Sequence, residues 1–307
     1  MADTATPKRG ADAADADRIE LSEEELEKLS SDSEGGPARK ATGWLGLITS
    51  ITAFGLGAYA LYWTQFAVNT TVYRSSFLAV ALALCFLLYP LTIPQKPVRR
   101  ASIEEWIIGA SGVVAGLYLV LNSSILWTPG WAGPMAIALI AIFALYPFAT
   151  TNRFLMKTQV LDWILVAIAI WSAVYLFYNT EAVKTRATRP LPEELILGAA
   201  LIFLILEATR RTIGWILPAI AIVFLIYGYA GPSMPEPFDH RGFSVSRIVG
   251  QNYLTLEGIF STPMDVAATF IILFTIYGAV LERGGAGRFF IDWAFALFGK
   301  NPSPSAQ

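Results

Sequence analysis

The chain has 307 residues, of which 55% are hydrophobic and 15% are charged, with a formal net charge of -2. This near-neutral balance provides no basic surface for nucleic acid. The single cysteine (Cys85) and the single histidine (His240) exclude a disulfide framework, most metal sites and Cys–His nucleophiles. We therefore expect no enzyme activity, no cofactor and no metal centre. Long apolar segments fill residues 43–299 and predict an all-α, polytopic integral membrane helix bundle.

Residues 1–42 are polar and alanine-rich, and they contain no apolar core of a signal peptide. From Met1 to Gly36 there are 11 acidic and 4 basic residues, which predicts a disordered acidic cytoplasmic tail. Within it, Ser22 and Glu25 have the spacing of a capping box, so we expect one short solvated helix there. The tail is interpreted as solubilising, with a docking peptide as the alternative.

Eight apolar segments follow, separated by short charged loops, and most approach the roughly 20 residues that a helix needs to cross a bilayer. They predict about eight spans, of which the third, sixth and eighth are short. The predicted spans are Gly43–Gln65, Ser75–Ile93, Glu105–Leu121, Ala132–Ala149, Leu161–Tyr178, Glu194–Ala208, Ile213–Ala230 and Asp265–Leu281.

The distribution of Lys and Arg orients these spans. With the amino terminus inside, twelve basic residues lie on the cytoplasmic side and six on the outer side. Because basic loops stay in the cytoplasm, we expect a multi-pass protein of the cytoplasmic (inner) membrane with a cytoplasmic amino terminus.

The sequence also contains a candidate internal repeat. A shift of 57 residues superposes Leu88-Tyr89-Pro90 on Leu145-Tyr146-Pro147 and Trp106-Ile107 on Trp163-Ile164. It gives 13 identities over the 44 positions from Ala79 to Asn122. Each copy holds two spans, which predicts a parallel repeat of the kind found in transporter folds. The alternative is a recurrent hairpin pattern without duplication.

Few ionisable groups lie within the apolar segments, and Glu207 is the clearest. Arg210 and Arg211 follow it by three and four residues, so either can neutralise it on one helix face. We interpret the three as a structural ion pair at the membrane margin, with a functional intramembrane acid as the alternative. Asp162 and Asp265 stand at predicted helix starts, where the helix dipole favours acids.

The longest outer segment, 231–263, begins with three prolines and then carries Asp239, His240 and Arg241, our candidate partner-facing residues. From Val245, apolar residues at helical spacing predict an amphipathic helix that either docks a partner or packs under neighbouring spans. Farther on, Gly284-Gly285-Ala286-Gly287 lacks the spacing of a phosphate loop and predicts a hinge before the short apolar helix Phe289–Phe298.

The succession of motifs from residue 206 to 299 resembles one transporter family. It is similar to the fused membrane permease of tripartite ATP-independent periplasmic (TRAP) transporters, of the type that works with TAXI binding proteins. The motifs are Leu206-Glu207-Ala208-Thr209-Arg210-Arg211-Thr212-Ile213-Gly214, Tyr227-Gly228-Tyr229-Ala230-Gly231-Pro232, His240-Arg241-Gly242, Leu256-Glu257-Gly258-Ile259-Phe260, Ala267-Ala268-Thr269-Phe270, Gly285-Ala286-Gly287 and Phe289-Phe290-Ile291-Asp292.

This resemblance implies secondary transport of organic acids, of the C4-dicarboxylate kind, with sodium as the coupling ion and a soluble extracytoplasmic TAXI-type binding protein as partner. It implies that 43–209 is a small, scaffold-type membrane domain. Residues 210–307 would be the beginning of the large transport-type domain.

The family's re-entrant hairpins, which bind sodium and substrate, are expected after the segment ending Phe298-Gly299-Lys300. None of their residues can be carried over to this sequence, so we expect transport only together with the remainder of the permease. The alternatives are a non-transporting membrane scaffold or interaction subunit, and a truncated remnant.

Overall fold

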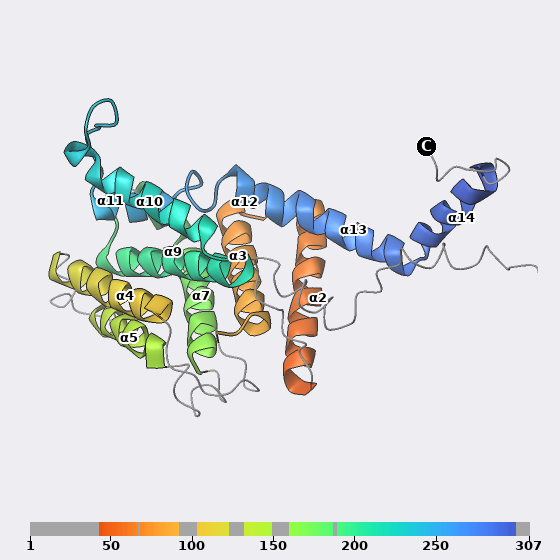
Figure 1. The fold of residues 1–307 in the computed structure, drawn as a ribbon, viewed down its shortest axis with the longest axis horizontal. Helices are drawn as coiled ribbons and strands as arrows, with labels where there is room; N and C mark the ends of the chain where they lie inside the picture. The colour runs from red at the N-terminus through yellow and green to blue at the C-terminus, as the bar shows by residue number, and fades with distance from the viewer. Residues whose placement is uncertain are drawn as a thin grey trace, which may run out of the picture.

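The structure is a computed structural model, and it describes residues 43–66, 68–91, 103–122, 132–148, 160–186 and 189–298. All regular structure in these ranges is helical (Figure 1), as the apolar segments predict. The expectations for the acidic tail 1–42 lie outside the described residues.

Five helical segments are long and apolar enough to cross a membrane, and they coincide with five of the eight predicted spans. The chain is therefore a multi-pass membrane protein. The five are α2 (Gly43–Gln65), α3 (Thr70–Leu88), α7 (Val160–Tyr178), α10 with η3 (Ile216–Ala230 and Gly231–Ser233), and α12 with η4 and α13 (Thr262–Val266, Ala267–Ile271 and Ile272–Arg283).

The other three predicted spans also form helices, but they do not meet the same criteria of length and apolarity. They are α4 (Ile103–Asn122), α5 with η2 (Ala132–Leu145 and Tyr146–Phe148), and α9 (Pro192–Thr212). In α9 the reason is charge, because two acids open the helix and an acid and two arginines close it. Helix α9 begins at Pro192, two residues before the predicted start at Glu194, and the Glu194 carboxylate accepts the Leu191 N–H at 2.8 Å.

The helices pack in pairs around one main core. Helix α3 lies against α7, α4 lies against α5, and α9 contacts both pairs. The core between α3, α7 and α9 contains fully buried Phe86, Leu176, Leu204 and Tyr253. This arrangement places both ends of α9 against the ends of α7, where the charged residues lie.

Glycines set the distance between α4 and α5. A Cβ on Gly112 would lie 1.8 Å from the ring of Phe143, and one on Gly116 would lie 2.5 Å from Ile140. A Cβ on Gly109 would lie 2.9 Å from Pro147. Small residues at this spacing let two helices approach closely in a membrane, where packing replaces the hydrophobic effect.

Helix α8 (Thr180–Thr185) follows α7, and α11 (Val245–Leu254) packs on α9. Gly198 of α9 makes this contact possible, because a Cβ there would lie 2.5 Å from Val249. The amphipathic helix predicted from Val245 thus packs beneath neighbouring helices, with Val249 and Tyr253 buried.

The segment after residue 261 leaves this body. Helix α13 passes α2, where Gly57 approaches Ile276, and α14 (Ala286–Phe298) lies farther out (Figure 1). The break between α13 and α14 falls at Gly284 and Gly285, which has a φ of 77°. This is the position of the predicted hinge.

The start of this segment is tied to α3 around a π-helical turn, η4. The Tyr73 hydroxyl donates a hydrogen bond to the Ala268 carbonyl within that turn. Arg74 adds an ion pair to Asp265 at 3.0 Å and a hydrogen bond to the Phe260 carbonyl at 2.6 Å. In a π-turn the backbone hydrogen bonds depart from the α-helical pattern. Here the hydroxyl of the buried Tyr73 donates to one carbonyl of the turn, that of Ala268.

Candidate functional site

A buried charged centre lies where the end of α9 meets the start of α7 and the ends of α3 and α5. Glu207 is 3% exposed, and its carboxylate receives hydrogen bonds from three side chains. Arg210 donates from Nε and Nη2, both at 2.9 Å, and the Tyr146 hydroxyl donates at 2.6 Å. Arg211 donates from Nε at 2.6 Å. The structure thus brings together the three predicted residues, and both arginines bind the acid.

Arg211 extends this centre to α7. Its Nη1 lies 2.5 Å from Oδ1 of Asp162 and 3.1 Å from the carbonyl oxygen of Tyr89. The guanidinium also lies over the ring of Phe86, 5.0 Å from its centroid. Among the described residues, Arg211 Nη2 is the buried side-chain N or O atom without a hydrogen-bond partner. The ring of Phe86 offers it a cation–π contact.

Asp162 and Tyr146 belong to this centre, although the sequence interpretation had not joined them to Glu207. Asp162 was assigned to a helix start, and it lies in the first turn of α7, where it accepts the N–H of Leu91, beyond the end of α3, at 3.3 Å. Its burial, at 3% exposed, shows that it also serves as a charge partner for Arg211. The internal repeat offered a signal for Tyr146, because it aligns Tyr146 with Tyr89, and both residues contact the centre.

The centre contains two carboxylates and two guanidiniums, so its formal charges cancel. Each carboxylate is hydrogen-bonded to a cation, as buried charges must be. Within the part of the chain that the structure describes, no group of three or more His, Cys, Asp or Glu could hold a metal ion. The centre is therefore an arrangement of ion pairs and not a metal-ligand set.

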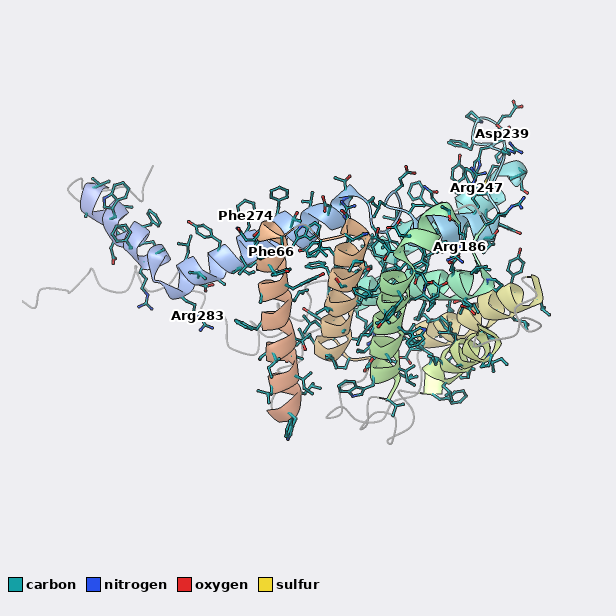
Figure 2. The ribbon with its side chains drawn as sticks, turned by 180° about the vertical axis from the view of Figure 1, so that it is seen from behind. Phe66, Arg186, Asp239, Arg247, Phe274 and Arg283 are labelled. Atoms are coloured by element: carbon teal, nitrogen blue, oxygen red, sulfur yellow. The ribbon has the colours of Figure 1, made fainter. Side chains whose placement is uncertain are left out.

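The outer segment separates its three predicted residues. Asp239 and Arg241 are exposed, whereas His240 is half-buried against Tyr227. Figure 2 shows Asp239 at the tip of the molecule, close to Arg247 and far from Arg283. The Gly242 N–H donates to Nδ1 of His240 at 3.0 Å, and Nε2 of His240 lies 3.0 Å from the Tyr227 carbonyl oxygen. His240 thus connects Tyr227 to Gly242 by hydrogen bonds inside the loop.

Beneath this loop, a second group of polar side chains joins α7, α8, α9 and α11. Glu194 is fully buried, and it pairs with Arg186 at 3.0 Å and accepts from the Tyr175 hydroxyl at 3.2 Å. Nearby, Tyr253 of α11 donates to the Ser172 carbonyl at 2.8 Å. Burial raises the pKa of the Tyr253 phenol well above its ordinary value of 10.0. These bonds join the end of α7 to α8, the start of α9 and α11.

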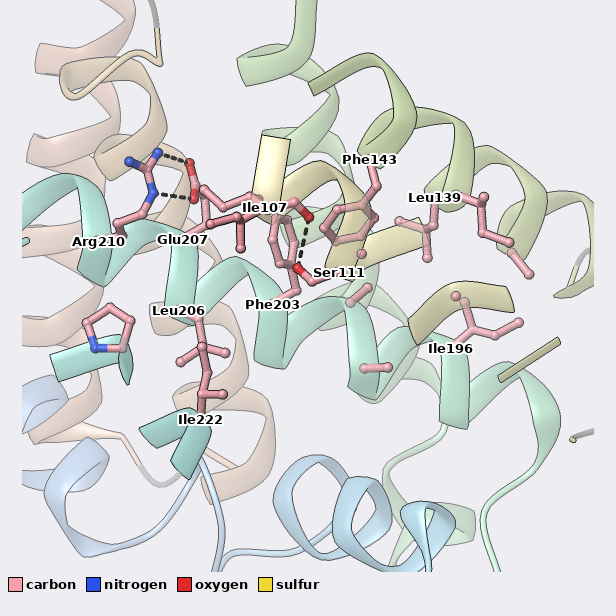
Figure 3. A pocket seen from close by; sticks show the side chains of 18 of the residues that line it. Ile107, Ser111, Leu139, Phe143, Ile196, Phe203, Leu206, Glu207, Arg210 and Ile222 are labelled. Carbon is pink, nitrogen blue, oxygen red and sulfur yellow. Dashed lines mark hydrogen bonds and ion pairs between the residues drawn. The ribbon is translucent and has the colours of Figure 1, made fainter. Parts of the chain in front are cut away.

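A cavity of about 470 Å³ lies between α4, α5, α9 and α10 (Figure 3). Its walls are apolar except for Ser111 and for one end, where Glu207 and Arg210 of the charged centre border it. Phe143 and Phe203 both line it, and their rings pack edge to face with centroids 4.2 Å apart. The sequence interpretation had not foreseen this cavity, because its walls come from helices far apart in the chain.

The spanning helices define a polytopic membrane protein. Residues 200–307 match the family model described as "Tripartite ATP-independent periplasmic transporter, DctM component". That family is a transport component and not an enzyme. The match begins within α9 and covers the outer segment, α13 and α14. Comparisons with curated proteins and with solved structures gave no match.

Proposed function

We propose that this chain is a membrane permease component of a TRAP-type secondary transporter for organic acids. The observation that carries the proposal is the match of residues 200–307 to the DctM component. We assign the fused, TAXI-associated type, C4-dicarboxylate-like substrates and sodium as the coupling ion, on the motif succession from residue 206. The cytoplasmic (inner) membrane is the corresponding location.

The proposed domain boundary lies at the end of α9. Residues 43–209 form a scaffold-type domain after the cytoplasmic tail 1–42, and 210–307 begin the transport-type domain. Two observations support this division. The family match starts at residue 200, and α13 and α14 extend away from the body that the earlier helices form. The parallel repeat at offset 57 belongs to the scaffold part, since Tyr89 and Tyr146 contact the same charged centre from its two copies.

We retain eight spans with a cytoplasmic amino terminus. In this topology, helix ends that are assigned to the same side of the membrane should contact one another, and the observed contacts support this. Tyr146, Asp162 and Arg211 are all assigned to the inner side, and they meet in one centre. Arg74 and Asp265 are both assigned to the outer side, and they form an ion pair.

The charged centre serves a structural role in this proposal. Glu207, Arg210 and Arg211 hold the end of α9 to α7 and η2, which keeps the scaffold rigid while attached parts move. The cancellation of charges and the large number of hydrogen bonds support this role over that of a proton or ion carrier.

The exposed residues of the outer segment are the proposed contact for the extracytoplasmic binding protein. Asp239 and Arg241 are the charged candidates, and His240 shapes the loop from within. Phe238 and Phe243, which are 63% and 47% exposed, supply apolar area beside them. Aromatic and arginine side chains at exposed positions are the residue types enriched in protein interfaces.

Uptake of labelled succinate by cells carrying the complete transporter tests the function. Deletion of this chain should abolish sodium-dependent uptake, and re-expression should restore it. Unchanged uptake after deletion would exclude a transport role and leave a membrane scaffold or interaction subunit.

The partner assignment has its own test. In the full permease, the double variant D239K/R241E should weaken binding of the TAXI-type protein by roughly tenfold or less, since rim charges chiefly alter association rates. The paired variant E282K/R283E reverses charges on α13, at the far side of the molecule (Figure 2), and should leave binding unchanged. Equal effects of the two variants would remove the outer segment as the docking surface.

A further inference from the structure

The cavity between α4, α5, α9 and α10 is not needed for any step of the proposed function. Ser111 is the neutral polar side chain on its wall, and its hydroxyl is bound to the Ile108 carbonyl of its own helix. The remaining wall is formed by aliphatic and aromatic side chains together with glycines and alanines. An occupant of this cavity must therefore be apolar along most of its length.

One end of the cavity differs, because Arg210 and Trp215 lie there. Arg210 binds Glu207 through Nε and Nη2, while its Nη1 has no hydrogen-bond partner among the described residues. Its side chain is 17% exposed, so a ligand can reach it. The Trp215 ring lies 5.5 Å from the guanidinium. Arginine and tryptophan are typical of the level of lipid headgroups.

The length of the cavity agrees with a lipid chain. Figure 3 shows Arg210 at one end of the lining residues of α9 and Ile196 toward the other. These residues are 14 positions apart (210 − 196), which is about 21 Å at 1.5 Å per residue. The hydrocarbon chains of one bilayer leaflet extend over about 15 Å. The lining of α9 is thus long enough for one acyl chain.

The cavity is apolar along most of its wall and carries an arginine at one end, and this division matches a molecule with an apolar chain and an anionic head. We propose that the cavity binds one acyl chain of a membrane phospholipid, whose phosphate accepts hydrogen bonds from Nη1 of Arg210. The phosphate approaches the guanidinium from the edge opposite to that occupied by Glu207.

Native mass spectrometry of the full chain in detergent containing dioleoyl phosphatidylglycerol tests this site. The wild-type chain should retain one phosphatidylglycerol. Ser111→Phe places a ring in the cavity and should lower this retention at least tenfold. Ala110→Phe is the matched control, since this exposed neighbour on α4 does not line the cavity, and it should retain the lipid.

A second comparison tests the headgroup contact. The wild-type chain should retain phosphatidylglycerol in preference to dioleoylglycerol, which has no phosphate. Arg210→Gln should remove this preference, with Glu207 still held by Arg211 and Tyr146. Thermal unfolding of each variant in the same detergent identifies any that fail to fold.

Three results would overturn the proposal. These are a wild-type chain without retained phospholipid, equal retention by the S111F and A110F variants, and a copurified peptide in place of lipid. Equal retention of the two lipids would overturn the phosphate contact. The measurement involves no transport, so failure of the proposed function would not affect it.

Discussion

Arg211 Nη1 lies 2.5 Å from Asp162 Oδ1, and this contact joins the end of α9 to the start of α7 across 49 residues of sequence. Both side chains are at most 5% exposed, so solvent does not screen their interaction. The same guanidinium binds Glu207 through Nε. One arginine therefore neutralises acids on two helices that must stay together.

Replacing Arg211 with glutamine should destabilise the protein strongly. The change leaves Asp162 without its cation, and breaking a buried pair in this way costs about 3–5 kcal/mol. The unfolding midpoint of the purified full chain in detergent measures the effect. Arg283→Gln, at an exposed position of α13, is the control and should leave the midpoint unchanged. In the double variant R211Q/D162N part of the loss should be recovered, and an additive loss would contradict a direct pairing.

Gly112→Val should disturb the crossing of α4 and α5. The new Cβ would overlap the Phe143 ring, and overpacking of a tight contact costs about 1–3 kcal/mol. Gly55→Val on α2 is the matched control, because no atom lies within 4 Å of its added Cβ. A comparison of the two thermal midpoints measures the difference. Equal midpoints would show that α4 and α5 do not require this close approach.

Tyr253→Phe should cost about 1 kcal/mol, since it removes the hydrogen bond to the buried Ser172 carbonyl. It should also alter the alkaline limit of stability. The folded state raises the pKa of Tyr253, so above pH 10 the phenol ionises in the unfolded chain and stays neutral in the folded one. The contribution of Tyr253 to the free energy of unfolding is therefore fully present below pH 10 and is lost as the pH rises above 10.

A series of unfolding curves from pH 8 to pH 11 checks this expectation. The fall above pH 10 should be shallower in the Y253F variant than in the wild type. Tyr277→Phe, at an exposed tyrosine of α13, should keep the wild-type slope. An unchanged slope in Y253F would mean that Tyr253 does not contribute to the alkaline fall.

Arg74→Gln should loosen the attachment of α13. It removes the ion pair with Asp265 and the bond to the Phe260 carbonyl. Because Asp265 is 36% exposed, we expect a loss of only about 1 kcal/mol. Cysteines at positions 57 and 276, in a Cys85→Ala background, report the contact between α2 and α13 through a short thiol crosslinker.

The crosslinking yield should fall in the R74Q variant. Arg247→Gln, which lies on α11 away from this contact, should keep the original yield. If both variants crosslink equally well, Arg74 does not hold α13 in place.

Apolar runs identified the helices well because length and hydrophobicity are local properties. The pair Glu207–Arg211 could be predicted for the same reason, since four residues bring side chains onto one helix face. The role of Asp162 could not, because it depends on α7 and α9 meeting with their charged ends in register. His240 was assigned outward from its polar neighbours, yet a hydrogen bond from the Gly242 N–H turns it inward.

The π-helical turn at Ala267–Ile271 also determines which face α13 presents. A π-turn contains one residue more than an α-helical turn for nearly the same rotation, so deleting one residue there should restore an ordinary α-helix and leave Ile276 facing Gly57. Converting the π-turn to α-helix without a change of length would instead rotate α13 by about 100° and bring a different side chain against α2. The segment should therefore tolerate the loss of one residue better than the gain of one.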